Sequence, residues 1–499
     1  MSLVIGTNIV ALFSQRSLQQ TEAMFNKAME RLSSGKRINS AADDAAGSAI
    51  VDRMTSQIKG LNQAVRNAND TISLIKTGEG AMQESAHILQ RMRELSVQSA
   101  SDTNTSADRQ YLQKEVSQLQ QELTRIAATT EFNQQKILNG QFTAKTFQIG
   151  ANAGQHLRMS IGDFSADKMG SQRLALNGSA NTAVSGASAA TITNTVSGAE
   201  DLTVAGYLGT TSIDVLNQGT ARDVAALVNG VSNTTGVSAT AETRTQLDNV
   251  SATGTFTLNL YGKNVSNGVN ISATISNVAD LSNLAEAINA RMASTGITAE
   301  LSADKSKVTM IQAEGYDIVV ENLLETGGSG ATMDFTGLDE AGSASGAAAA
   351  LGAAVGTDSG RVAGSVVFAS ARDYTVRSAA SGGLFNNVNA NASALNNVAA
   401  VDITTQAGAN AAIGVLDGAL SFVQDERAML GATQNRLSTT VSNLTNVSSN
   451  TEASRSAIWD TDFAKTSSIL AKQKILQQAG TAMLVQANQN MQGVLSLLR

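Results

Sequence analysis

The residues that could perform catalysis or bind a metal ion are few in this chain and lie far apart. Cys is absent, and the two His residues, His87 and His156, fall in different segments. No HExxH pattern, paired Cys/His set or Gly-rich phosphate loop occurs, so the sequence offers neither a metal-ligand set nor an activated nucleophile. Asp and Glu are numerous, but none forms a recognisable acid–base pair. We therefore expect no enzymatic activity and no cofactor.

Composition narrows the function classes further. The 35 Lys and Arg residues against 42 Asp and Glu leave a net charge of -7, whereas a nucleic-acid-binding protein would present a basic face. Pro is absent too, although about 5% is typical. Pro breaks helices and isomerises slowly, so a chain without Pro suits long helices and repeated refolding. We favour this explanation of its absence over compositional drift. No basic region precedes an apolar core at the N-terminus and no apolar run reaches about 18 residues, so we expect neither a secretory signal nor membrane insertion.

Both ends of the chain carry apolar residues at seven-residue spacing, which is typical of helices that pack lengthwise. Each such residue contributes about 1.5–3 kcal/mol when it is buried, so the pattern outweighs local helix propensity. Coiled-coil helices and ordinary amphipathic core helices would both pack side by side here. The tracks are Ile58, Val65 and Ile72; Leu61, Ala68, Ile75 and Met82; Leu112, Leu119 and Ile126, with Val116 and Leu123 between them; and Leu416, Val423, Leu430, Leu437 and Leu444.

The extreme ends carry apolar stripes of their own. A stripe that runs to the last residue needs a partner, because chain ends are otherwise polar and frayed. We therefore expect the two end segments to be helices that bury these stripes against other helices. The N-terminal stripe is Ala11, Leu18, Phe25 and Leu32, and the C-terminal one is Ile469, Leu476 and Met483 with the offset track Leu484, Met491 and Leu498.

The segment SGKRINSAADDAAG (34–47) interrupts the helical pattern near the N-terminus. Gly35 can end one helix in a left-handed conformation. Asn39, Ser40 or Asp43 can cap the next helix through a side-chain oxygen. We therefore expect a joint between the end helix and the helix that follows.

The middle of the chain changes from helical spacing to alternation. The segment KTFQIGANAGQHLRMSIGDF (145–164) predicts a hairpin, with apolar residues alternating about Gly-containing turns. Residues 223–239 align without a gap to residues 283–299, and Asn229 matches Asn289 in this alignment. Each copy predicts a short helix, a turn at Gly and a strand. Two copies are too few for a solenoid, so we expect a duplicated α+β unit in a compact outer domain.

At this point the chain resembles bacterial flagellin, the protein of the flagellar filament. The N-terminal resemblance begins at RLSSGKRINSAADDAAG and continues through LQRMRELSVQSA and EFNQQKILNG, and the C-terminal one is KQKILQQAGTAMLVQANQNMQGVLSLLR (472–499). It covers roughly residues 1–180 and 396–499, and the middle matches the family's variable region. Many flagellins carry Pro just after QANQ, where this chain has Met491, so the last helix is expected to continue without a break.

The resemblance implies a fold that is mainly α: a coiled-coil or helical-bundle rod built from both chain ends with a small β-hairpin region, plus a central α+β, β-rich variable outer domain. The implied domains are an N-terminal inner-tube helix (1–45), N-terminal rod helices and β-hairpin (46–180), a variable solvent-facing outer domain (181–395) with duplicated units at about 220–245 and 280–305, a C-terminal rod helix (396–455) and a C-terminal inner-tube helix (456–499).

The same resemblance implies a structural subunit that self-assembles into the extracellular helical filament used for swimming. Its end helices would be disordered in the monomer and would fold on assembly, against each other and against neighbouring copies. The implied partners are further copies of the chain, hook–filament junction and filament cap proteins, and an export chaperone that holds residues 470–499. A type III-like flagellar export apparatus would export the chain unfolded and without a cleaved signal peptide.

Flagellins are also recognised by Toll-like receptor 5 through the rod. The matching residues here are Gln90, Arg91 and Leu95, plus Glu115. Arg91 and Leu95 are four residues apart and would share one helix face. A solvated ion pair or a subunit contact would explain Arg91 and Glu115 equally well.

Two other functions remain open at this stage. A hook–filament junction protein shares helical ends, although the complete C-terminal motif favours a filament protein. A secreted adhesin would bind its ligand through residues 185–395, and ligand binding by that isolated fragment would distinguish it from a filament protein.

Overall fold

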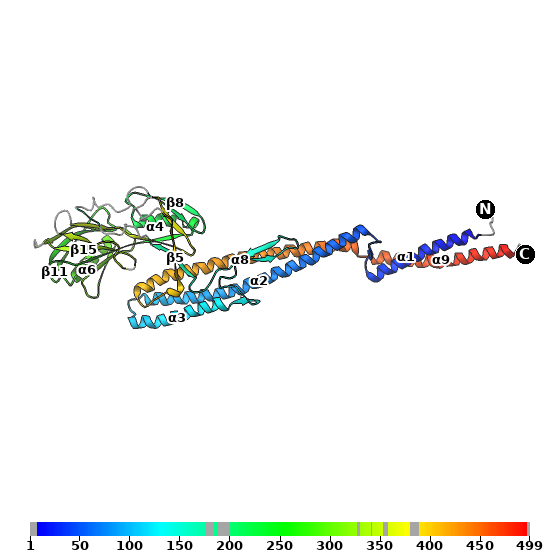
Figure 1. Cartoon of the computed structure of the whole chain (residues 1–499), viewed down its shortest axis with the longest axis horizontal. Coiled ribbons are helices and arrows are strands. Elements are labelled where there is room, and N and C mark those ends of the chain that lie inside the picture. The colour runs from blue at the N-terminus through cyan, green and yellow to red at the C-terminus, as the bar shows by residue number, and fades with distance from the viewer. Residues whose placement is uncertain are drawn as a thin grey trace. The chain divides into compact units, whose positions relative to one another are not determined.

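The computed structural model describes residues 7–175, 184–186, 200–326, 330–340, 342–352, 358–379 and 389–496. The described chain forms two compact units. The terminal unit contains residues 1–76, 144–160 and 430–499, and the central unit contains residues 77–143 and 161–429. Five long helices come from the two chain ends, as the seven-residue spacing predicts (Figure 1). They are α1 Ile9–Ser34, α2 Ala45–Ser99, α3 Ser106–Thr129, α8 Gln406–Trp459 and α9 Phe463–Ser496.

The apolar tracks of these helices are buried. Ile58, Leu61, Ala68, Ile75 and Met82 are at most 5% exposed, and Val65 and Ile72 are half-buried. In α3, Val116 and Leu123 are fully buried while the flanking track is half-buried. In α8 the buried members are Leu416, Val423, Leu430 and Leu437, and Leu444 is half-buried.

Strands and short helices fill the region between α3 and α8. The short helices are α4 Ala221–Gly230, α5 Ser232–Thr235, α6 Ser282–Asn289 and α7 Met292–Thr295, with a 3-10 turn at Val398–Ala400. The strands are β1 Glu131–Phe132, β2 Gln135–Lys136, β3 Lys145–Gln148, β4 His156–Met159, β5 Gly170–Ala175, β6 Val184–Gly186, β7 Glu200–Ala205, β8 Thr210–Val215, β9 Ser238–Asp248, β10 Gly254–Tyr261, β11 Val269–Ile275, β12 Ile297–Leu301, β13 Val308–Gln312, β14 Ile318–Thr326, β15 Thr332–Leu338, β16 Ala349–Gly352, β17 Ser359–Val362, β18 Ser365–Ser370, β19 Thr375–Ser378, β20 Asn391–Ala392 and β21 Ala394–Asn397.

The predicted hairpin is confirmed and belongs to the terminal unit. β3 and β4 pair antiparallel, with Phe147 opposite Leu157. The Asn67 side-chain amide of α2 donates to the Gln148 carbonyl at 3.0 Å and ties the hairpin to the helix. Leu157 and Met159 are both 6% exposed, so the hairpin buries its apolar face.

The central unit contains three larger sheets. Their strand orders are β11-β10-β14-β17-β6, β12-β13-β9-β18-β5-β21 with β15 and β16 branching from β9, and β20-β19-β7-β8. Two apolar cores lie against these sheets. One contains Val224, Val228 and Phe368, and the other contains Leu284, Ile288 and Phe335. Each core thus includes one of the two short helices that the duplication predicts.

The two copies of the repeat make the same local hydrogen bonds. In the first copy, the Asn229 side chain donates to the Ala239 carbonyl and accepts from the Ala239 N–H, both at 2.8 Å. In the second copy, Asn289 makes the same two bonds with Ala299, also at 2.8 Å. The turn glycines have φ values of 74° at Gly236 and 69° at Gly296, a region that costs other residues strain. Each copy therefore closes its helix–turn–strand corner by the same device.

Candidate assembly and recognition surfaces

The two chain ends meet in the terminal unit, where α1 lies alongside α9 (Figure 1). The Asn8 side chain accepts from the Ala11 N–H and so caps α1, while its amide donates to the Ala487 carbonyl at 3.2 Å. Further along, the Gln473 amide lies 3.6 Å from the Met24 sulfur. Because a low residue number in α1 faces a high one in α9, the two helices are antiparallel.

The face between α1 and α9 is only partly apolar. From α1, Leu18, Phe25 and Leu32 are half-buried against it and Ala28 is 4% exposed. From α9, the most buried residues are Thr466, Gln473 and Ala487, each 7% exposed, and Leu484 is half-buried. The face of α9 that contacts α1 therefore consists mainly of small and polar side chains.

The larger apolar side chains of α9 point elsewhere. Ile469 is 38%, Leu476 44% and Met483 61% exposed. Met491 lies in α9, but its side chain and Leu498 lie outside the described residues. The same helix pair exposes further large apolar residues, namely Ile9, Val10, Leu12, Phe13, Met24, Met29, Phe463, Ile475 and Val485. The pair thus carries an uncovered apolar surface, which is uncommon on a protein that remains monomeric.

The joint between α1 and α2 is built from residues of both chain ends. Gly35 ends α1 at φ 70°, as predicted. The predicted cap of α2 is wrong by one or more positions, because the Asp44 carboxylate accepts from the Gly47 N–H at 2.8 Å. Asp43 instead accepts from the Asn39 and Ser40 N–H groups and closes the loop on itself.

Trp459 anchors this joint from the end of α8. Its indole N–H donates to the Ile38 carbonyl at 2.9 Å. The Lys36 ammonium lies 4.3 Å from the centre of the ring, and the Arg455 guanidinium lies 5.6 Å from it. Arg37 donates through its guanidinium to the Ile458 carbonyl. Sequence reasoning missed this set, because the only signal was a single Trp in an otherwise polar stretch.

The predicted recognition residues lie in the central unit at the interface of α2 and α3. The Arg91 guanidinium pairs with Glu115 at 2.9 Å and with Glu94 at 3.2 Å. The hydrogen bond to Glu115, followed by that to Glu94, raises the pKa of Arg91 above its ordinary value. Gln90 is exposed, whereas Leu95 is 1% exposed and packs into the helical core. The structure therefore brings Arg91 and Glu115 together at the surface and places Leu95 beneath them.

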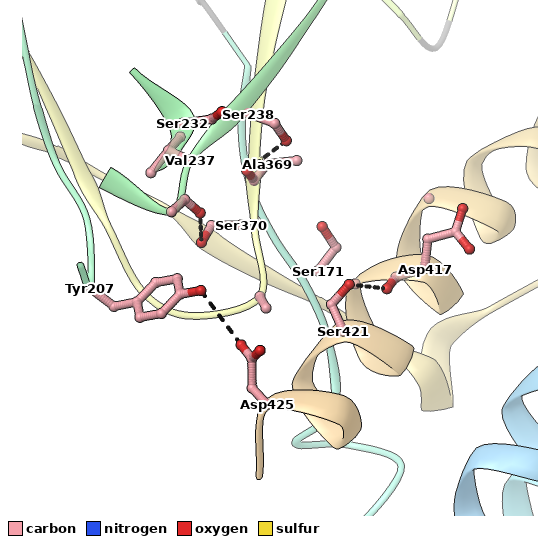
Figure 2. Close-up of a pocket in the computed structure, with 14 residues that line it drawn as sticks. Ser171, Tyr207, Ser232, Val237, Ser238, Ala369, Ser370, Asp417, Ser421 and Asp425 are labelled. Carbon is pink, nitrogen blue, oxygen red and sulfur yellow. Dashed lines mark hydrogen bonds between the residues drawn. The ribbon is translucent and has the colours of Figure 1, made fainter. Parts of the chain in front are cut away.

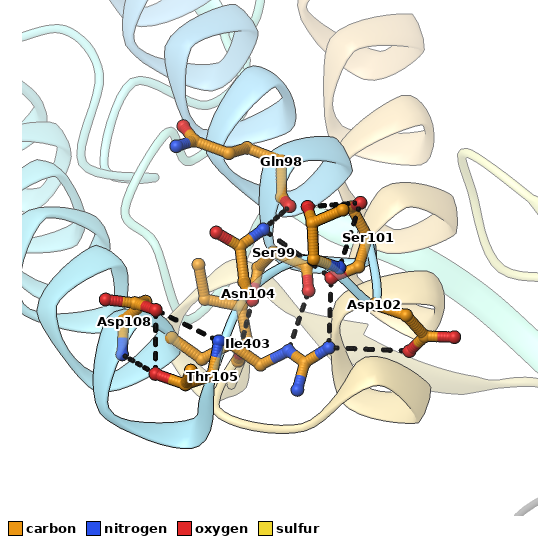
Figure 3. Close-up of polar contacts among 10 residues, drawn as sticks. Gln98, Ser99, Ser101, Asp102, Asn104, Thr105, Asp108 and Ile403 are labelled. Carbon is orange, nitrogen blue, oxygen red and sulfur yellow. Dashed lines mark hydrogen bonds and ion pairs between the residues drawn. The ribbon is translucent and has the colours of Figure 1, made fainter.

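The turn between α2 and α3 holds these two helices together (Figure 3). The Thr105 hydroxyl and the Asp108 carboxylate form a reciprocal capping box at the start of α3. The Arg109 guanidinium donates to the Ser99 carbonyl at 2.8 Å, and the Ser99 hydroxyl donates to the Ile403 carbonyl at 2.6 Å. These bonds satisfy polar groups at the end of α2 and at the start of α3.

A cleft of the central unit has a volume of about 450 Å³ and lies beside α8 (Figure 2). Its polar lining includes Ser171, Ser370, Ser421 and Asp417, and the Tyr207 hydroxyl lies 3.5 Å from Asp425. No His lines this cleft, and no cluster of metal-ligating side chains occurs among the described residues.

Comparison with known proteins decides the family. The N-terminal helical region of bacterial flagellin matches residues 5–143, and the C-terminal helical region matches residues 413–498. The B-type flagellin of Pseudomonas aeruginosa is 40% identical over the full length of both chains, and flagellin B of Vibrio anguillarum is 36% identical over the full length of both. The chain belongs to the bacterial flagellin family.

As a flagellin, the chain is a structural subunit of the extracellular flagellar filament and not an enzyme. The predicted fold class is confirmed, with helical ends and a central β-rich region. Flagellin B of Vibrio cholerae is also similar, at 35% identity over the full length of both chains. Among the described residues, no helix has the length and apolar character needed to span a membrane.

The joint of this flagellin should be sensitive to acid. The Lys27 ammonium lies 2.7 Å from Asp43, and this bond, aided by the Asn39 and Ser40 N–H groups, lowers the pKa of Asp43 to about 2. Because the folded-state pKa is below its ordinary value of 3.8, the carboxylate stabilises the joint above about pH 4 and loses that contribution as the pH falls toward 2. We expect wild type to melt at a higher temperature than Asp43→Asn at pH 5, by circular dichroism.

The difference between the two chains should shrink as the pH falls from 4 to 2, because Asp43 of the unfolded chain is protonated there and Asp43 of the folded chain becomes half protonated near pH 2. An Asp402→Asn chain is the control, since Asp402 belongs to the central unit and not to this joint. A gap between wild type and Asp43→Asn that stays constant from pH 5 to pH 2 would contradict the assignment.

Proposed function

We propose that this flagellin polymerises through the α1–α9 pair, and that the apolar surface left uncovered on this pair is buried between subunits in the filament. The observation that carries the proposal is the exposure of Leu476 and Met483, 44% and 61%, on a helix whose inner face is small and polar. A contact of this surface with a different surface of the next subunit does not close on itself and builds a helical filament.

The energetics of the pair support assembly-coupled ordering. A long helix with a weak partner is marginal in water. Each large apolar side chain that the filament buries contributes about 1.5–3 kcal/mol. The end helices of the free subunit are therefore weakly ordered, and they gain their stability when neighbouring subunits cover them.

Seeded polymerisation tests this function. Purified full-length subunit and a chain ending at Gln486 are each mixed with filament seeds, and filament length is measured by electron microscopy. We expect long filaments from the full-length chain only, because the truncated chain lacks the last turns of α9. Equal growth of both chains would refute the assembly role of these turns. No growth of either chain would favour the junction or cap-associated role instead.

The remaining partners follow from the family. The subunit meets hook–filament junction and filament cap proteins at the two ends of the polymer. Before assembly, an export chaperone holds the apolar segment 470–499, and a type III-like apparatus exports the unfolded chain without a cleaved signal peptide. The absence of Cys and Pro suits this route, since nothing cross-links in transit and no slow isomer delays refolding. Rotation of the filament then propels the cell.

A second role is recognition by Toll-like receptor 5 through the Arg91–Glu115 surface. The supporting observation is that Gln90, Arg91 and Glu115 are exposed on adjacent helices, with Arg91 half-exposed and paired. Leu95, being buried, would position α2 and would not contact the receptor.

A receptor-reporter assay with purified monomer tests this role. Arg91→Asp places a negative charge opposite Glu115 and should reduce receptor activation at least about tenfold, because a removed charge partner at an interface costs 2 kcal/mol or more. The control is Arg125→Asp, which disrupts an exposed pair with Glu122 on α3. Equal activation by the two variants would contradict the assignment.

A further inference from the structure

The methionines of this flagellin differ widely in their exposure to solvent. The chain has 14 Met and no Cys, so its thioethers are the side chains that a peroxide oxidises most readily. In the α1–α9 pair, Met24 is 56%, Met29 50% and Met483 61% exposed. Five methionines of the central unit are at most 1% exposed, namely Met82, Met92, Met169, Met310 and Met333. An oxidant in solution therefore reaches the helix pair before it reaches these buried positions.

Two of the exposed methionines lie on the apolar surface that the filament is proposed to bury. Met483 and Leu476 are seven residues apart on α9 and share one helix face, and both are exposed. Met29 lies one turn from Phe25 on α1, and Phe25 is half-buried. Met29 and Met483 would thus contribute to a contact between subunits as unbranched apolar side chains.

Met24 is placed differently, because it lies at the contact between the two helices. Its sulfur lies 3.6 Å from the amide nitrogen of Gln473, and Gln473 is 7% exposed. Oxidation of Met24 therefore changes a group at the α1–α9 contact, whereas oxidation of Met29 or Met483 changes the outer surface of the pair.

Oxidation of a thioether replaces an apolar group by a polar one. The sulfur attacks one oxygen of hydrogen peroxide and the O–O bond breaks. The proton of the attacked oxygen moves to the leaving hydroxide, which departs as water, so that the sulfur is oxidised to a sulfoxide and the peroxide is reduced. The sulfoxide oxygen accepts hydrogen bonds, and its burial among apolar side chains without a donor costs free energy.

We propose that Met24, Met29 and Met483 form an oxidation-sensitive site of the free subunit, at which conversion to sulfoxides by peroxide blocks polymerisation. Incorporation into the filament shields Met29 and Met483 from the same reaction. This inference rests on the proposed polymerisation through the α1–α9 pair and adds a covalent modification to it. Methionine sulfoxide reductases return the sulfoxide to the thioether, so the block is reversible.

Peroxide treatment of the purified full-length subunit tests the site. Wild type is treated with hydrogen peroxide under native conditions, the sulfoxide at each methionine is measured by peptide mass spectrometry, and seeded growth is measured by sedimentation. We expect oxidation of the three methionines to raise the critical concentration at least about tenfold, because each loses apolar area that the contact would bury. Subsequent treatment with methionine sulfoxide reductases should restore growth.

Leucine variants identify the positions that matter. A chain with Met24→Leu, Met29→Leu and Met483→Leu nearly conserves the volume of the three side chains and cannot be oxidised at them. We expect this chain to grow as wild type does, both before and after peroxide. The matched control is Met292→Leu, which removes a methionine that is 47% exposed in the central unit and should leave the subunit as sensitive to peroxide as wild type.

The same treatment of assembled filaments separates this inference from the polymerisation on which it rests. We expect Met29 and Met483 to be oxidised at least about tenfold more slowly in filaments than in the free subunit, because the oxidant must wait for a local opening of the contact. The oxidation of Met292 in each sample provides the reference rate.

Three outcomes would overturn the inference. If filaments protect Met29 and Met483 but the oxidised subunit grows as well as wild type, the polymerisation role stands without the oxidation-sensitive site. If both residues are oxidised equally fast in subunit and filament, the surface faces solvent and both proposals fail. If the triple leucine chain also stops growing after peroxide, the sensitive group lies elsewhere in the subunit.

Discussion

A subunit carrying Leu476→Gln and Met483→Gln is expected to stay monomeric at concentrations at which wild type forms filaments. The two side chains are 44% and 61% exposed in the subunit, so their replacement costs the monomer little. Burial of each between subunits contributes about 1.5–3 kcal/mol, and the loss of both should raise the critical concentration by about 10²- to 10⁴-fold. Gln keeps helix propensity and adds no charge, so the change removes apolar contact alone.

The measurement is sedimentation of seeded polymer over a range of subunit concentrations. Leu216→Gln with Leu324→Gln is the matched control, because these residues are 71% and 52% exposed in the central unit. We expect the control chain to polymerise as wild type does. A critical concentration that is unchanged in the α9 variant would show that these side chains face solvent in the filament.

Replacement of Arg361 by Met is expected to destabilise the central unit by about 3–5 kcal/mol, because it leaves a buried carboxylate without its cation. The Arg361 Nε donates to Asp317 Oδ2 at 2.8 Å. The side chain of Asp317 is only 5% exposed and that of Arg361 is 18% exposed. Loss of the guanidinium therefore leaves a carboxylate that is still largely buried.

Chemical denaturation of the subunit, followed by circular dichroism in the β-strand region, measures this effect. The control is Lys307→Met, which removes a partner of Asp248 at 3.6 Å from a pair whose lysine is 48% exposed. Such a surface pair contributes no more than about 1 kcal/mol. Equal shifts of the unfolding midpoint in the two variants would show that Asp317 finds another partner or takes up a proton.

The helical ends were predictable because one chain supplies both sides of each contact. The residues Leu416, Val423, Leu430 and Leu437 are all buried at the spacing that the sequence shows. The duplication was predictable for a related reason. Asn229 and Asn289 each bond a residue ten positions ahead, so the signal is local and repeats as one block. The hairpin β7–β8, which precedes the first copy, was not predicted.

The orientation of α9 was not predictable from its own sequence. Apolar periodicity indicates which side chains become buried, but it does not say which chain buries them. Gln473 and Thr466 face α1, whereas Leu476 and Met483 do not. The prediction of the residue that caps α2 was also wrong, by one position. Asp43 and Asp44 are adjacent and chemically equal, so the path of the loop alone decides that Asp44 bonds the helix and Asp43 binds Lys27.

The packing of Trp459 at the joint has a practical consequence. It is the only Trp of the chain, and it lies between two cations with its indole N–H bonded to Ile38. Ultraviolet-excited emission from the whole subunit therefore comes mainly from this one place, where residues of both chain ends meet. Any movement that separates Ile38 from the end of α8 changes the polarity around a single fluorophore. The subunit thus carries an intrinsic optical reporter of its joint, usable in monomer and filament alike without an attached dye.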